Sequence, residues 1–331
     1  MKSCNFLILY TTLCLTVCDP KSAENVVDST SITNAGVMST ASHNTISIVY
    51  SSIDGGNTWH AFDHGIPPDA TISSFLVQDD KIFASTDYDG IYLIKRMEKQ
   101  WKRIDEDLPK GIDINTILIS GKTFIIGTLR HGIMISKNDG KNWDSPSIQI
   151  NTPVRTLHKM QNLTFAGADN GIYKSLDDGK TWTHIYKGVQ VNGFTELNHK
   201  IYAAVMNGAI MSDDNGITWK YIYKSNTLHD ISNDGKKLYA MTLGDGLKSS
   251  DENGITWDQI NNGLGTLNLY TFELKTFGNK IFAAQWYGIY SSDNWGKTWN
   301  IIKNGLPDST AFTTLEVTRN GLIAGIGLRR K

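Results

Sequence analysis

Short apolar stretches alternate with polar turns along most of the chain, and the same order of stretches returns about every 40 residues. In one copy the stretches lie at residues 154–158, 163–167, 171–175 and 181–185. No segment keeps the apolar period of about 3.6 residues that marks an amphipathic helix. The pattern therefore predicts an all-β fold built from repeated units of four short strands.

An octapeptide that ends in tryptophan stands between the third and fourth strands of the unit. Its best copy, residues 175–182, reads Ser-Leu-Asp-Asp-Gly-Lys-Thr-Trp, and a degenerate seventh copy ends at Trp101. In the six clear copies the acidic or amide position is held by Asp54, Asn138, Asp177, Asp214, Glu252 and Asn294, and the last position by Trp59, Trp143, Trp182, Trp219, Trp257 and Trp299. With Trp101, the closing tryptophans follow one another in steps of 37 to 42 residues.

Each residue type of the octapeptide has a physical task in a tight hairpin turn. The Asp or Asn side chain accepts hydrogen bonds from backbone N–H groups of the turn, and the glycine takes a positive φ that other residues adopt only with strain. The threonine opens the outgoing strand, and the tryptophan buries a large ring. The repeated acidic residues are therefore predicted to be structural, not catalytic.

The octapeptide resembles the Asp-box, also called the bacterial neuraminidase repeat, which implies a β-propeller with one four-stranded blade per repeat. The ends of the chain set the number of blades. Residues 312–317 and 321–325 supply a first and a second strand, and residues 45–50 and 58–62 supply the missing third and fourth. We expect residues 44–331 to form a seven-bladed β-propeller of four-stranded antiparallel blades, closed by two strands from each terminus.

The first 43 residues differ in character from the repeats. Residues 1–18 have a short positive end and an apolar stretch of about a dozen residues, which is typical of a secretory signal. Residues 15–18, Leu-Thr-Val-Cys, resemble a lipoprotein box in which Cys18 would be acylated; the alternative is a plain signal. Residues 19–43 are predicted to be a flexible tether. We expect an exported protein, located in the periplasm, anchored to a membrane by lipid, or secreted.

Composition narrows the possible partners. The chain has 32 Lys+Arg against 33 Asp+Glu, a formal net charge of -1, and seven arginines. This balance supplies no basic field for a phosphate backbone, so nucleic acid is excluded as a partner. All three cysteines lie within the first 18 residues, which leaves no disulfide framework. We expect a monomer without a cofactor, in contact with a membrane only through a lipid anchor.

The loops between the second and third strands vary from blade to blade, at the end of the ring opposite the Asp-boxes. Variation within copied blades is where a binding site is expected. The candidate residues on this face are Asp87, Tyr88, Asp89, Arg130, His131, Arg155, Asp169, Trp286 and Tyr287.

Three groups of these candidates each have two interpretations. Trp286 and Tyr287 suit a flat partner or a sugar ring, or else pack over the mouth of the ring. The arginines at 130 and 155, from successive blades, could clamp a carboxylate or phosphate, or be solvated charges. The aspartates at 87 and 89 look like half of a calcium loop, but the same pattern is ordinary turn chemistry, so no metal site is predicted.

Two families carry related repeats. Sialidases place three arginines and an Arg-Ile-Pro segment around a site, whereas the one Arg-Ile pair here is followed by Asp105. The chain resembles more closely the exported seven-bladed propellers of the photosystem II assembly and stability factor family, which implies a scaffold without catalytic residues. We therefore expect a non-catalytic propeller that binds a protein in the cell envelope. The alternative is a glycan-binding or glycoside-hydrolysing propeller that uses Trp286, Tyr287 and carboxylates of the same face.

Overall fold

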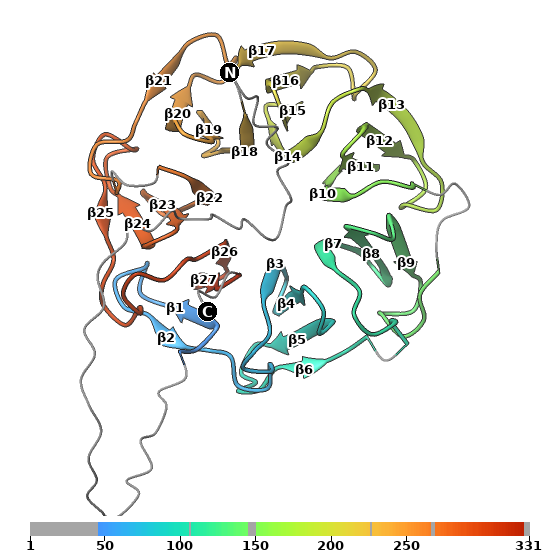
Figure 1. Cartoon of the computed structure of the whole chain (residues 1–331), viewed down its shortest axis with the longest axis horizontal. Helices are drawn as coiled ribbons and strands as arrows, with labels where there is room; N and C mark the ends of the chain where they lie inside the picture. Colours follow the sequence, from blue (N-terminus) through green and yellow to red (C-terminus); the bar gives the residue numbers. More distant parts are fainter. Residues whose placement is uncertain (1–45, 106, 145–149, 226, 266–268, 328–331) are drawn as a thin grey trace, which may run out of the picture. The chain divides into compact units, whose positions relative to one another are not determined.

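The computed structural model describes residues 46–105, 107–144, 150–225, 227–265 and 269–327. The predicted signal at 1–18, the tether at 19–43 and Cys18 lie outside these residues. The described chain folds into seven antiparallel sheets that follow one another around a ring (Figure 1), which confirms the predicted all-β fold and the number of blades. Across the residues that the structure describes, no helix is long and apolar enough to cross a membrane.

Six of the sheets, here called blades A to F, are each made of consecutive strands. Blades A to C contain β3 (Ile72–Gln78), β4 (Lys81–Thr86), β5 (Ile91–Lys95), β6 (Lys102–Arg103); β7 (Ile114–Ser120), β8 (Thr123–Thr128), β9 (Ile133–Ser136); and β10 (Val154–Met160), β11 (Leu163–Ala168), β12 (Gly171–Ser175), β13 (Thr183–Lys187). Blades D to F contain β14 (Val191–Leu197), β15 (Lys200–Val205), β16 (Gly208–Ser212), β17 (Lys220–Lys224); β18 (Leu228–Asn233), β19 (Leu238–Thr242), β20 (Gly246–Ser250), β21 (Trp257–Gln259); and β22 (Thr271–Phe277), β23 (Lys280–Gln285), β24 (Gly288–Ser292), β25 (Asn300–Ile301).

The seventh sheet, blade G, joins the two ends of the propeller. Its strands are β1 (Val49–Ser52), β2 (His60–Ala61), β26 (Thr314–Thr318) and β27 (Gly321–Gly325), in the order β2-β1-β27-β26. The register pairs Val49 with Gly325 and Ser52 with Leu322. The predicted closure by two strands from each terminus is therefore confirmed, although β1 and β2 lie a few residues from their predicted bounds.

The first strand of every blade lines the centre of the ring. Strands β3, β7, β10, β14, β18, β22 and β26 lie innermost in Figure 1, and each contacts the first strand of the next blade. In blade B three strands are described, and a bridge between Ile135 and Asp144 continues its outer edge.

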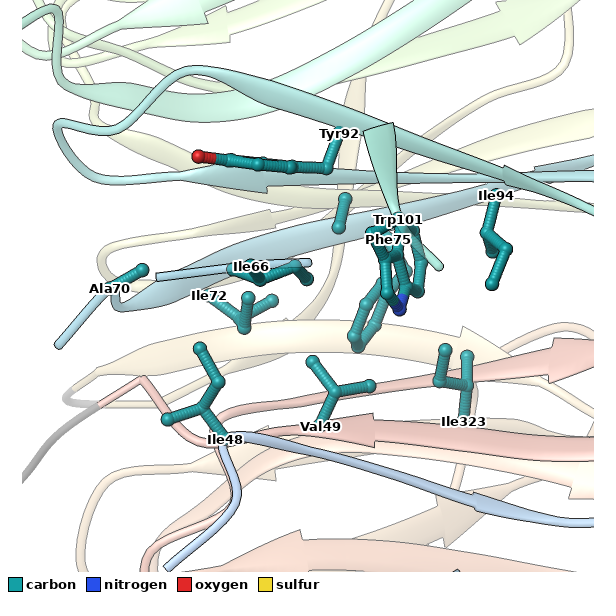
Figure 2. Packing of buried hydrophobic residues seen from close by; sticks show 11 residues of the cluster. Ile48, Val49, Ile66, Ala70, Ile72, Phe75, Tyr92, Ile94, Trp101 and Ile323 are labelled. Atoms are coloured by element: carbon teal, nitrogen blue, oxygen red, sulfur yellow. The ribbon is translucent and has the colours of Figure 1, made fainter. Parts of the chain in front are cut away.

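The core lies between neighbouring blades. Figure 2 shows the interface of blades G and A, where Val49 and Ile323 face Ile72, Phe75 and Trp101. Each fully buried side chain of this size stabilises the fold by about 1.5–3 kcal/mol. Trp101, from the degenerate repeat, is 2% exposed, so the loss of the turn residues in that copy has not removed its packing role.

Five of the six clear Asp-box turns share the hydrogen bonds of the serine and of the Asp or Asn. In residues 175–182 the carboxylate of Asp177 accepts from the backbone N–H of Thr181 at 2.9 Å and from its hydroxyl at 2.8 Å. The hydroxyl of Ser175 accepts from the N–H of Gly179 at 2.8 Å, and the indole N–H of Trp182 donates to the carbonyl of Gly179 at 2.8 Å. Because the N–H of Thr181 binds Asp177, β13 begins at Thr183, two residues later than predicted.

One Asp-box differs from the predicted assignment. In residues 250–257, Asp251 accepts from the N–H groups of Asn253 and Ile255 at 3.2 and 3.4 Å. The carboxylate of Glu252, to which the sequence gives this task, accepts instead from the side chain of Asn198 in the neighbouring blade. The longer glutamate side chain reaches across to that blade, and the shorter aspartate beside it binds the turn.

Candidate functional site

The candidate residues gather at one end of the ring, called here the mouth face. In blade C the register pairs Val154 with Ala168 and Ala168 with Gly171, so the start of β10 and the loop after β11 lie at the same end. The opposite pairing, Met160 with Leu163, lies on the side of the Asp-box. The same antiparallel order in every blade places all second-to-third loops on the mouth face.

A β-bulge stands at the start of six innermost strands, where the ladder skips one residue. These unpaired residues, called the bulge ring, are Ser73, Asn115, Arg155, Asn192, His229 and Phe272. Three of them join neighbouring blades: the amide of Asn115 donates to the carbonyl of Val154 at 3.0 Å, that of Asn192 to the carbonyl of Leu228 at 2.7 Å, and Nε2 of His229 lies 3.2 Å from the carbonyl of Phe272. A bulge re-aims a side chain without breaking the sheet. The ring therefore presents five types of side chain on one repeated backbone.

A charged cluster occupies the mouth face between blades A and B. Arg130 donates through Nε to the carboxylate of Asp113 at 2.5 Å, and the ring of Tyr88 lies 6.0 Å from its guanidinium carbon. The side chain of Asp113 is 3% exposed and that of Arg130 is 63% exposed. His131 adds a nitrogen 3.8 Å from the same carboxylate. The buried carboxylate of Asp113 thus holds the exposed guanidinium of Arg130 beside the exposed ring of Tyr88.

Asp87 is close enough to this cluster to be affected by its charges. Burial, together with the negative charges of Asp113 and Asp89, raises the pKa of Asp87 to about 6. The backbone N–H of Asp89 donates to the hydroxyl of Thr86 at 3.0 Å, which is a hydrogen bond of a turn. Among the described residues, no group of three or more His, Cys, Asp or Glu is placed to hold a metal ion.

The two candidate arginines each bind an aspartate of their own blade. Arg155 forms an ion pair with Asp169, and its side chain is 10% exposed, whereas Arg130 binds Asp113. Burial, with a smaller contribution from the positive charge of Arg155, lowers the pKa of His229 to about 4. The side chain of Arg155 is thus largely buried, while that of Arg130 faces the solvent.

An aromatic cluster stands on blades E and F, beside the mouth. The hydroxyl of Tyr270 lies 2.8 Å from Nδ1 of His229, and the ring of Phe272 meets those of Tyr270 and Trp286 edge to face, with centroids 4.7 and 5.0 Å apart. Trp286 and Tyr287 are both partly buried. The tryptophan thus packs against its own blade and also keeps part of its surface in solvent.

A second charged cluster lies deeper, on the innermost strands of blades E to G. The ammonium group of Lys275 lies 3.0 Å from the carboxylate of Glu273 and 2.8 Å from that of Glu316. Burial alone would lower the pKa of Lys275, but these two carboxylates raise it. Burial and, to a smaller extent, the charge of Glu273 raise the pKa of Asp230 to about 7.

The sequence reasoning missed Asp113, Tyr270 and the bulge ring apart from Arg155. These residues come from the starts of first strands and from the connections that precede them, whereas the search followed the second-to-third loops. A signal was present: six of the innermost strands begin with a buried residue that is followed by a partly buried side chain, and this side chain is of five types in the six blades.

Comparison with known proteins adds relatives of the fold. No family model matches the chain. Over 147 residues, 44% of this chain, it is 26% identical to adenine deaminase 2 of Oenococcus oeni, and the match spans 25% of that protein. Among solved structures, YCF48 bound to D1 peptide is 15% identical with a TM-score of 0.62, and the match covers 78% of this chain and 91% of YCF48.

Two longer proteins contain a similar propeller. The extracellular domain of the one component system BT4673 from B. thetaiotaomicron is 15% identical with a TM-score of 0.66, over 80% of this chain and 38% of that one. An ancestral GH74 enzyme is 15% identical with a TM-score of 0.63, over 84% of this chain and 45% of that one. At this level of identity, the matches show the fold alone. For the fold, the match to YCF48 confirms the resemblance to photosystem II assembly factor propellers that was drawn from the sequence.

Proposed function

We propose that the protein is an exported, non-catalytic propeller that binds a protein partner through the mouth face. The observation that carries this proposal is the exposure of large side chains on loops that hydrogen-bond to the preceding connection, from the N–H of Asp87 to the carbonyl of Thr71 and from that of Leu243 to that of Thr227. Tyr88 is 51% exposed and Leu243 47% exposed, on the second-to-third loops of blades A and E. Aromatic and arginine side chains on a fixed frame are the residues that dominate protein interfaces.

The relatives of the fold support a binding role. YCF48 was solved with a D1 peptide, and the BT4673 propeller belongs to an extracellular domain. For this chain, export and anchoring remain proposals that start from residues 1–18. If Cys18 carries a lipid, the Cys18→Ala variant will move from the membrane fraction to the soluble fraction of the envelope, as immunoblotting of the two fractions would measure.

The experiment is a cross-linked capture of the tagged full-length chain from its native envelope. The test variant is Tyr88→Ser with Leu243→Ser, because neither side chain is buried and the melting temperature should be unchanged. Trp286→Ala with Tyr287→Ala is a second test, with a stability loss of about 1 kcal/mol expected from the contact between Trp286 and Phe272. The matched control is Leu176→Ser, 72% exposed on an Asp-box turn.

A protein that both mouth-face variants lose and the control retains would support the proposal. The same protein retained by all variants at equal yield would contradict it. In that case the exposed residues of the mouth face would be ordinary surface.

Glycoside hydrolysis at the mouth face is the second candidate. One observation favours it: the pKa of Asp87, raised to about 6, is in the range of a general acid. A hydrolase would cleave sialyl or xyloglucan oligosaccharides and lose this activity in Asp87→Asn. Equal rates in the wild type and the variant would exclude this role of Asp87.

A further inference from the structure

A groove of about 610 Å³ lies outside the mouth face, where the outer strand of blade E meets the Asp-box turn of blade F. One wall is β21 with the residues that follow it, and the other is the turn that carries Trp295. The volume falls within the range of small-molecule sites. None of the candidate residues of the mouth face lines this groove.

The tryptophan in this turn departs from the repeat. Trp295 has a φ of 60° and is 40% exposed. The same position of other Asp-boxes holds Gly55, Asp139, Asp178 or Asn215, types that tolerate a positive φ. A bulky side chain in this conformation is strained, and strain of this kind collects at functional sites. The repeat accounts for the positive φ of this turn, but it does not account for a tryptophan side chain at this position.

Three charged groups line the groove around the indole. The ammonium groups of Lys237 and Lys297 and the carboxylate of Asp258 make no hydrogen bond or ion pair within the described part of the chain. Two cations and one anion leave a net positive groove. The exposed side chains of Gln259 and Asn262 add amide groups that can donate or accept hydrogen bonds.

Both walls of the groove are fastened to each other. The indole N–H of Trp299 donates to the carbonyl of Ile260 at 2.7 Å, and its backbone N–H to the carbonyl of Asn262 at 2.9 Å. In the other five clear Asp-boxes the closing tryptophan binds the glycine of its own turn. A side chain at Gly296 would lie 2.6 Å from Ile260, so the turn fits closely against blade E. The groove is therefore preorganised, which lowers the entropy lost on binding.

We infer that this groove binds a saccharide that carries carboxylate groups. The exposed face of Trp295 offers a flat apolar surface for the C–H face of a sugar ring. Asp258, Gln259 and Asn262 supply partners for hydroxyl groups, and Lys237 and Lys297 supply charges for a uronic or sialic acid carboxylate. The site is separate from the mouth face and goes beyond the proposed function.

Calorimetric titration of the full chain tests the inference with tetragalacturonate, 3′-sialyllactose and neutral cellotetraose. At least one of the two acidic saccharides will bind about tenfold more tightly than cellotetraose. Trp295→Asn will weaken that binding at least about tenfold, and its melting temperature will be equal or higher because asparagine tolerates the positive φ. Lys237→Gln with Lys297→Gln will weaken it to a similar extent and reduce its dependence on salt.

Two controls remove an exposed apolar side chain and a lysine from other Asp-box turns. Ile217→Asn removes an exposed apolar side chain, and Lys141→Gln removes the lysine that precedes Asn142 as Lys297 precedes Thr298; both will leave binding unchanged. Failure of both acidic saccharides to bind, or equal binding by Trp295→Asn, would overturn the inference. If cellotetraose binds as tightly as the acidic saccharides and the lysine substitutions do not weaken binding, the carboxylate part of the inference would be overturned. Trp286→Ala will not affect this binding, so the result is independent of the proposed function.

Discussion

The two ends of the same blades follow opposite rules. At the Asp-box end, Asp54, Asp177 and Asp214 accept from the backbone N–H four residues later at 2.9, 2.9 and 2.8 Å. At the mouth face, the bulge ring repeats its backbone while its side chains range from serine to arginine and phenylalanine. Hydrogen bonds that recur from blade to blade belong to the part of each blade that is needed for folding. Side chains that differ on the same backbone belong to the part that can be specific for a ligand.

Blade F breaks this division on the Asp-box side. Its turn keeps the hydrogen bond of the repeat in which Asn294 accepts from the N–H of Thr298, at 2.9 Å, although the indole of Trp299 binds blade E. It also carries Trp295, which the turn does not require. A position that diverges within the copied end is informative for the same reason as the mouth face, and it supports the inferred ligand of the groove.

The largest expected effect comes from a pair of glycine substitutions, one at each end. Gly216, in an Asp-box, and Gly188, on a mouth-face loop, have φ values of 80° and 89°. A methyl group at Gly216 would meet the ring of Phe165 at 2.7 Å, whereas at Gly188 nothing lies within 4 Å. Gly188→Ala will lose about 1–2 kcal/mol from the left-handed backbone alone, and Gly216→Ala about 1–3 kcal/mol more from overpacking.

Urea unfolding of the two variants measures the difference. Because both substitutions pay for the same backbone strain, their difference isolates the packing of the Asp-box turn against the neighbouring blade. Equal losses in unfolding free energy would mean that the copied end is no more tightly packed than the mouth face.

The copied end could be predicted from the sequence, because its information is local. All the residues that form an Asp-box turn lie within eight positions of the sequence, and the closure of blade G follows from the number of predicted strands. The divergent end could not be predicted in the same way. The contact of Arg130 with Asp113 spans 17 residues, and that of Tyr270 with His229 spans 41 residues and two blades. Such pairs depend on the register and on the bulges, which leave no periodic signal.

The assignment of Glu252 shows the same limit at the copied end. Its position in the octapeptide predicts that Glu252 binds the turn. Asp251 binds it instead, because its side chain is shorter. Trp295 is the converse case. Its departure from the repeat is visible in the sequence, yet its groove depends on how blade F packs against blade E.

A second prediction concerns a divergent position on the innermost strands. The residue after the bulge is Gly193 in blade D, Asp230 in blade E and Glu273 in blade F. Burial and Glu273 raise the pKa of Asp230 from 3.8 to about 7. The folded state therefore binds more protons than the unfolded state between about pH 4 and 7, so Asp230 makes the protein less stable as the pH rises through this window.

Asp230→Asn removes this penalty. At pH 8 the variant will be more stable than the wild type by roughly 1–3 kcal/mol, and the gain will shrink toward pH 4. Thermal melts at both pH values measure the gain. Asp213→Asn, at an exposed aspartate beside Lys220, is the control with little change. A gain that is the same at pH 4 and pH 8 would show that packing, not charge, sets the effect.

The smallest expected effect tests whether the Asp-box is only structural. Burial alone would raise the pKa of Asp177, but hydrogen bonds from the backbone and hydroxyl of Thr181 lower it. The stability from these bonds is present above the ordinary pKa of an aspartate and is lost as the pH falls through the lowered value. Asp177→Ala will therefore lose about 1–2 kcal/mol at pH 7, and the loss will diminish toward pH 2.

Asp177→Asn is the matched variant, because asparagine already holds this position in blades B and F, as Asn138 and Asn294. It will keep most of the stability and none of the dependence on pH. Both variants will bind the mouth-face partner like the wild type, since their turn lies at the other end of the blade. If Asp177→Ala loses that partner while its melting temperature is unchanged, the copied end carries function, and the division between the two ends is wrong.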